Sequence, residues 1–298
     1  MDNYTDELGD NAVPNYNLLT ALGNKNLKEI YIGFIKSDRI SLISPTGIEI
    51  MLKKSVNLKS FYLAEILGKI NVRTRMGFPI SLKGCTTKLK KLGLSYYEDN
   101  VDLIHTIKQF TNLKQLLLYP CRFDYAAVLN NDTKFLKLKS LGTSYIIYND
   151  KMLDEVHSNF PNIKELSISL EVEATDFSKF KKLHSLEIKS NFTSITNDMI
   201  KKITKSLPTL YTLKILDGYK IGNEGFEYIA ENCQNLKTLK ICNYYGINKK
   251  AADALKKCTK LTRLYLVKPT IADEDIDAHN ETLVYLKNNL PNLKHTNF

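Results

Sequence analysis

Histidines and cysteines, the side chains most often used in catalysis and metal binding, form no known catalytic or metal-binding spacing in this sequence. Neither a CxxC pair nor an HExxH or Ser-His-Asp spacing occurs, and glycine loops that cradle phosphates are absent. The acidic run Asp273-x-Asp275-x-Asp277 lacks the glycine and the terminal glutamate of an EF-hand calcium loop. We therefore predict that the chain is not an enzyme, has no cofactor or metal, and keeps its five cysteines as reduced, mostly buried thiols: Cys85, Cys121, Cys233, Cys242 and Cys258.

Aromatic side chains recur in the first half of the chain and could bind a polypeptide. Large, fairly rigid, amphipathic rings are the usual anchors of protein interfaces. The candidates are Tyr31, Phe34, Tyr62, Tyr96, Tyr119 and Tyr145. The alternative is that several of these rings only cover the surface on which they lie.

Basic side chains in the second half could hold an acidic or phosphorylated segment through charge-assisted hydrogen bonds. These candidates are Lys189, Lys214, Lys240, Arg263 and Lys268, together with Tyr265. Against this prediction, Glu187 and Asp217 lie close by in the pattern, and an exposed lysine is most often only solvated. Lysine pairs such as Lys181-Lys182 never extend into a basic run of roughly 5–8 residues, so we interpret them as solvated surface and do not favour nucleic acid as a ligand.

A repeated pattern, L-x-x-L-x-L, runs along the chain and must position these side chains. Its first residue, called the anchor below, is Leu27, Leu58, Leu89, Leu113, Leu138, Ile163, Leu183, Leu210, Leu236, Leu261 or Leu293. The mean interval is 26.6 residues, and 31 of the 33 pattern positions are apolar, the exceptions being Thr143 and Thr296. The second and third apolar positions alternate with a polar residue, which predicts a short strand with one buried face in each repeat.

The segments between these strands change to a helical period. Apolar residues at i, i+3 and i+7, such as Phe226, Ile229 and Cys233, predict amphipathic helices. We expect N-caps at Thr196, Asn223 and Asn248, and turns into the next strand at Pro161, Pro208 and Pro291. The predicted fold is α/β: a horseshoe-shaped solenoid of about eleven strand-loop-helix repeats, with parallel strands on the concave face.

Composition sets the remaining limits. The 298 residues are 43% hydrophobic and carry a net charge of +10, which is spread over both halves of the chain. No apolar run reaches the roughly 18 residues of a membrane helix, and the acidic start is unlike a signal peptide, so we expect a cytoplasmic or nuclear protein that does not enter a membrane. We assign residues 1–26 to an N-terminal cap or tail and residues 27–298 to one solenoid.

The run from Ile221 to Ile241, with Cys233 three residues before its anchor, closely resembles the cysteine-containing leucine-rich repeat. Ile195–Asp198 with Leu207–Leu210 is a second match, and Cys258–Leu261 is a third. This ribonuclease-inhibitor-like class is typical of F-box proteins and of the antagonist of mitotic exit network family. The first three repeats depart from it, because their anchors are 31 residues apart and the residue three before each anchor is polar.

This resemblance implies the substrate-recognition half of a ubiquitin ligase, in which an F-box preceding the repeats docks on a Skp-type adaptor. Only 26 residues precede the first anchor, against the roughly 40–50 that such a helical module needs, so no F-box is visible and the adaptor is expected only if an F-box is supplied elsewhere. Our first hypothesis is a protein-interaction module that uses its concave face. The alternative is a scaffold or assembly factor that binds nucleic acid or an acidic partner through the same basic face.

Overall fold

The computed structural model describes most of the chain. It covers residues 23–34, 45–65, 82, 85–94, 101–118, 134–170, 176–189, 195–244, 246–267 and 276–297. Within these ranges only the backbone is described for residues 34, 45, 64–65, 101–104, 144–147, 276–279 and 297. The contacts divide the chain into unit 1, residues 1–112 with 121–124, and unit 2, residues 113–120 with 125–298. The prediction of one solenoid over residues 27–298 stays a prediction.

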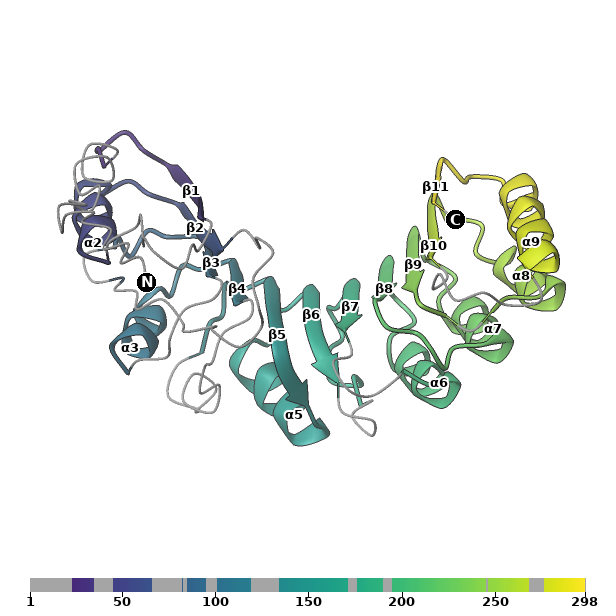
Figure 1. Cartoon of the computed structure of the whole chain (residues 1–298). Helices are drawn as coiled ribbons and strands as arrows, with labels where there is room; N and C mark the ends of the chain where they lie inside the picture. The colour runs from purple at the N-terminus through teal and green to yellow at the C-terminus, as the bar shows by residue number, and fades with distance from the viewer. Residues whose placement is uncertain are drawn as a thin grey trace, which may run out of the picture. The chain divides into compact units, whose positions relative to one another are not determined.

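The described part of unit 1 contains three parallel strands and two helices, which Figure 1 labels. Strand β1 (Glu29–Phe34) pairs with β2 (Ser60–Glu65), which pairs with β3 (Lys91–Leu94). Helix α2 (Pro45–Lys54) connects β1 to β2, and α3 (Val101–Gln109) follows β3. Ser55, the polar residue three positions before the second anchor, is fully buried, and its hydroxyl donates a hydrogen bond to the Met51 carbonyl at 2.8 Å. A buried polar group is thereby satisfied within its own repeat.

In the described part of unit 2, eight parallel strands pair in chain order from β4 to β11. The strands are β4 (Gln115–Leu118), β5 (Ser140–Tyr148), β6 (Glu165–Leu170), β7 (Ser185–Lys189), β8 (Thr212–Ile215), β9 (Thr238–Cys242), β10 (Arg263–Val267) and β11 (His295–Asn297). The helices are α5 (Asp150–Asn159), α6 (Asn197–Ser206), α7 (Asn223–Asn232), α8 (Lys249–Leu255) and α9 (Ile276–Asn289). From β7 to β11 strand and helix alternate as predicted, whereas the described residues include no helix between β4 and β5 or between β6 and β7. Helices α6 to α9 stand side by side on one side of their strands (Figure 1).

The core lies between the strands and the helices. Nine of the eleven anchors are buried, the exceptions being the partly exposed Leu27 and Leu293. At the second pattern position, Leu186, Leu213, Leu239 and Leu264 are completely buried. Each fully buried leucine contributes roughly 1.5–3 kcal/mol by leaving water. The polar exception Thr143 is also buried, and its hydroxyl donates to the Tyr148 hydroxyl at 3.1 Å. The leucine pattern therefore identified the core correctly.

Helix ends follow the predictions with one exception. The side chains of Thr196 and Asn248 accept hydrogen bonds from Met199 and Ala251 amides and cap α6 and α8. The predicted cap Asn223 is wrong, because α7 begins at Asn223 and the N-cap is Gly222, which has no side chain to cap with. The Asn223 carboxamide oxygen accepts instead from the Asn248 amide of the next repeat, at 2.7 Å.

Candidate functional site

The sheet face is the surface formed by the strand side chains that alternate with the buried leucines. Its central row lies four residues after each anchor, and the strand register brings that row together. In unit 1 Tyr31 pairs with Tyr62 and Tyr62 with Gly93. In unit 2 the neighbours in order are Leu117, Gly142, Ser167, Glu187, Lys214, Lys240 and Tyr265.

Two of the predicted aromatic residues form a stack in unit 1. The rings of Tyr31 and Tyr62 lie 4.7 Å apart between centroids and are nearly parallel, with an interplanar angle of 4°. The Tyr62 ring covers Gly93 so closely that a Cβ at Gly93 would lie 2.3 Å from Tyr62 Cδ1. Burial, followed by the neighbouring Tyr31 and Glu29, raises the pKa of the Tyr62 hydroxyl, so this ring stays neutral. Tyr31 remains 63% exposed and presents one face of a preorganised aromatic surface.

The other predicted aromatic residues have no described side chain. Phe34 is the last residue of β1, and only its backbone is described. Tyr145 lies in the part of β5 where the register with β6 shifts between Gly142 and Ile147. Tyr96 and Tyr119 lie outside the described residues. The described aromatic surface therefore consists of Tyr31 and Tyr62.

The predicted basic residues of unit 2 fall into two sets. Lys189 and Lys214 both contact Glu187, with Nζ to carboxylate distances of 3.3 and 3.2 Å, and the Ser167 hydroxyl donates to Glu187 at 3.0 Å. Burial raises the pKa of Glu187, but the charges of Lys189 and Lys214 with the Ser167 hydrogen bond outweigh it and lower the pKa below its ordinary value. Much of the positive charge of Lys189 and Lys214 is thus neutralised within the sheet face.

The second basic set is Lys240 and Arg263, which form no ion pair with any carboxylate of the described residues. Lys240 lies beside Tyr265 in the strand register, and Arg263 lies two residues before Tyr265 on the same face of β10. Lys268 lies outside the described residues. Lys240, Arg263 and Tyr265 therefore form the part of the predicted stripe that keeps uncompensated positive charge.

A further set of lysines was missed by the sequence analysis. We define the strand-start edge as the residues two before, one before and one after each anchor. The residue one after the anchor is lysine in eight of the eleven repeats: Lys28, Lys59, Lys90, Lys114, Lys139, Lys164, Lys237 and Lys294. The recurring triplets N-L-K and K-L-K carry this signal, which lies outside the alternating strand positions.

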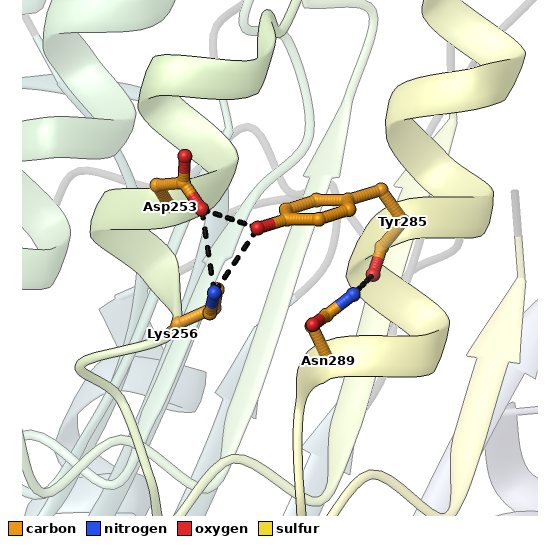
Figure 2. A network of polar contacts seen from close by, with 4 residues as sticks. All are labelled: Asp253, Lys256, Tyr285 and Asn289. Carbon is orange, nitrogen blue, oxygen red and sulfur yellow. Dashed lines mark hydrogen bonds and ion pairs between the residues drawn. The ribbon is translucent and has the colours of Figure 1, made fainter.

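One polar cluster connects α8 to α9 (Figure 2). The Tyr285 hydroxyl donates to Asp253 at 2.6 Å, and Lys256 Nζ donates to the Tyr285 oxygen at 3.0 Å. The Tyr285 hydrogen bond is the main cause that lowers the pKa of Asp253 and raises the pKa of Lys256, so both groups are held in their charged forms. A carboxylate held in this way is a poorer base, so the cluster gives no support to catalysis.

Within the described part of the chain, no group of three or more His, Cys, Asp or Glu side chains is placed to hold a metal ion. The helices seen there also include none with the length and apolar character needed to cross a membrane.

Comparison with known proteins identifies the fold. No protein-family model and no curated protein matches the chain. Among solved structures it is similar to the leucine-rich-repeat-containing protein LegL7 of Legionella pneumophila, with 14% identity, a TM-score of 0.51, and coverage of 90% of this chain and 89% of LegL7. It is also similar to internalin C2 of Listeria monocytogenes, with 20% identity, a TM-score of 0.42, and coverage of 64% of this chain and 73% of internalin C2. The parallel strands alternating with helices are those of an α/β leucine-rich-repeat solenoid.

Proposed function

We propose that this leucine-rich-repeat chain is a non-catalytic protein-interaction module whose sheet face binds a polypeptide. The observation that carries the proposal is the Tyr31-Tyr62 stack, in which an exposed ring is fixed by its neighbour. Rings that are already ordered lose little conformational freedom on binding, so more of their contact energy appears as affinity. Tyrosine is also enriched among the residues that dominate binding energy.

A library of random peptides displayed on phage and selected on the full chain tests this proposal. The selected peptides should bind a Tyr31→Ala, Tyr62→Ala double variant roughly 30-fold more weakly, because losing one dominant residue removes about 2 kcal/mol. Tyr219→Ala is the matched control, since Tyr219 is 49% exposed but lies outside the sheet face. Equal binding to all three proteins contradicts the role of the stack.

The finer part of the proposal is an acidic or phosphorylated residue of the partner beside Lys240, Arg263 and Tyr265. These two cations have no carboxylate partner among the described residues, and Arg263 offers the planar donors that suit a phosphate or carboxylate. A selected peptide should bind the parent chain more tightly in its phosphorylated form than in its unphosphorylated form, as measured by fluorescence anisotropy. The difference should vanish on a Lys240→Glu, Arg263→Glu variant.

Membership of a ubiquitin ligase is a separate proposal that rests only on the resemblance of the cysteine-containing repeats. A purified Skp-type adaptor should bind only when an F-box is supplied by further chain or by a partner. Binding of the adaptor to this chain alone, or its failure to bind in both cases, contradicts that expectation. Neither result affects the proposed role of the sheet face.

A further inference from the structure

The strand-start edge is rich in lysine in both units. Its 33 positions hold 14 lysines and no aspartate or glutamate. The chain as a whole has 42 Lys and Arg against 32 Asp and Glu, so the remainder carries 28 basic against 32 acidic residues. The net positive charge of the protein is therefore confined to this edge.

The backbone fixes the edge lysines in register within each unit. Each residue after the anchor donates its amide to the carbonyl of the equivalent residue in the preceding repeat, as in Lys164 to Lys139 at 2.8 Å and Lys139 to Lys114 at 2.8 Å. Neighbouring strands lie about 4.8 Å apart, so lysines on adjacent strands form a row with about this spacing. Every residue of the edge is at least partly exposed, and none of the eight lysines after an anchor forms an ion pair within the described chain. Such a row of like charges favours an extended polyanion.

A small hollow opens beside the row in unit 2. Phe160, Ile163 and Phe180 line it together with Lys179, Lys181 and Lys182, and the Lys179 ammonium pairs with Asp154 at 2.6 Å. Its volume of about 250 Å³ is below the roughly 300–1,000 Å³ of small-molecule pockets, so it suits a single apolar side chain. Leu136, which also belongs to the edge, is 58% exposed among Lys114, Lys137 and Lys139.

These features favour an acidic polypeptide over nucleic acid. The aromatic residues of the row, His184 and Tyr211, already stack on each other at 5.0 Å, and the Lys237 ammonium lies 5.2 Å from the Tyr211 ring centre. Tyr211 is 43% exposed, but a nucleobase that stacks on its ring would have to compete with His184 and with the Lys237 ammonium. Apolar side chains beside lysines gain nothing from a phosphodiester backbone but can bury the apolar residues of a peptide.

We propose that the strand-start edge of unit 2 binds an extended acidic segment of a partner protein and that the hollow receives one of its apolar side chains. The surface is distinct from the sheet face of the proposed function, so either proposal can fail alone. Lysine rather than arginine along the row supplies point charges without fixed geometry. The segment is thus recognised by charge along the row and by the apolar residue at one place.

The test uses the full chain and three variants with the same change of charge. The edge pair is Lys139→Glu with Lys164→Glu, the sheet-face pair is Lys214→Glu with Lys240→Glu, and the control pair on α6 is Lys202→Glu with Lys205→Glu. The probe is a fluorescent glutamate peptide with one central phenylalanine, measured by anisotropy at low salt. We expect the edge pair to raise Kd at least about tenfold and the other pairs less than about twofold.

A peptide with serine in place of the phenylalanine should bind about tenfold more weakly, and higher salt should weaken both peptides. Circular dichroism melting checks the fold, and a Lys139→Gln, Lys164→Gln pair replaces the edge pair if the latter is unfolded. Equal loss in all three pairs, or a loss confined to the sheet-face pair, overturns the inference. Tighter binding of oligo-dT than of the glutamate peptide overturns it in favour of nucleic acid.

Discussion

Lys189 and Lys214 on the sheet face of unit 2 differ in their surroundings from Lys164 on the strand-start edge. Lys214 on the sheet face lies 3.2 Å from Glu187 of the preceding strand, whereas Lys164 on the edge has no carboxylate partner within the described chain. In a solenoid the neighbours of a side chain come from equivalent positions one repeat away. Whether a lysine is available to a ligand therefore depends on the residue type that recurs at its own position.

The same comparison explains why the charge looked diffuse in the sequence. Counting by halves of the chain spreads the edge lysines evenly, because no repeat contributes more than two of them. The fold stacks these equivalent residues into a row, and acidic residues lie at other positions of the repeat. Charge that is dispersed in sequence is thus concentrated in space.

The largest expected effect tests whether both surfaces depend on the same core. Leu213 is fully buried and lies between Thr212 and Lys214 on β8, in the same repeat as the edge residue Tyr211. Leu213→Ala should lower the free energy of unfolding by roughly 2–5 kcal/mol, because it removes buried methyl groups and leaves a cavity. Urea denaturation measures the loss, and hydrogen exchange should show lost protection first in β7, β8 and β9.

Thr212→Ala is the matched control on the same strand, since Thr212 is partly exposed. Its effect on the free energy of unfolding should stay within about 0.5 kcal/mol. Uniform loss of protection along unit 2 in Leu213→Ala would show that the repeats unfold together. Local unfolding of one repeat would then not disrupt the sheet face and the strand-start edge separately from the rest of unit 2.

Sequence reasoning identified the elements because their signals are local. The anchor leucines, the helical period of Phe226 and Ile229, and the proline turns each reflect the conformation of one repeat. The cap at Gly222 was missed because a glycine can occupy an N-cap without a side-chain hydrogen bond. The polar side chain of Asn223, which looked like the cap, is used by the next repeat instead.

The interactions that the sequence could not predict join one repeat to the next. The asparagine before an anchor donates its side-chain amide to a backbone carbonyl of the preceding repeat, as in Asn57 to Lys25 at 2.9 Å and Asn292 to Thr259 at 2.7 Å. The lysine that takes this place in other repeats donates to the preceding asparagine, as in Lys260 to Asn235 at 2.6 Å. The partner in each hydrogen bond is set by how adjacent repeats stack, and the residue pattern of a single repeat carries no information on that stacking.

A smaller effect is expected when the same lysine-to-glutamine substitution is made on each of the two surfaces. The change in the free energy of unfolding should differ in sign between them. Lys214→Gln removes an ion pair of Glu187 and should lower the free energy of unfolding by about 0.2–1 kcal/mol, because the pair is partly exposed and screened. Lys164→Gln relieves repulsion from the neighbouring Lys139 and should leave stability unchanged or raise it slightly. Thermal melting at low salt measures both variants. If Lys164→Gln destabilises the chain as much as Lys214→Gln does, the difference between the two surfaces does not exist.

The smallest effect is a pH dependence confined to the sheet face. The pKa of Glu187 is lowered in the folded chain, although burial alone raises it, because Lys189, Lys214 and the Ser167 hydroxyl favour its carboxylate. A carboxyl whose folded pKa lies below its unfolded value stabilises the fold at higher pH. Its contribution is fully present above the ordinary value of 4.5 and is lost as the pH falls through the folded value.

Glu187→Gln should therefore be less stable than the parent chain at about pH 7, and this difference should shrink as the pH falls below about 4. Urea denaturation across this pH range measures the difference. In a Lys189→Gln, Lys214→Gln background the carboxylate loses both cations, so Glu187→Gln should cost less stability and the pH dependence should weaken. The same pH dependence in both backgrounds would mean that the two lysines do not compensate Glu187, and that they are as free as the lysines of the strand-start edge.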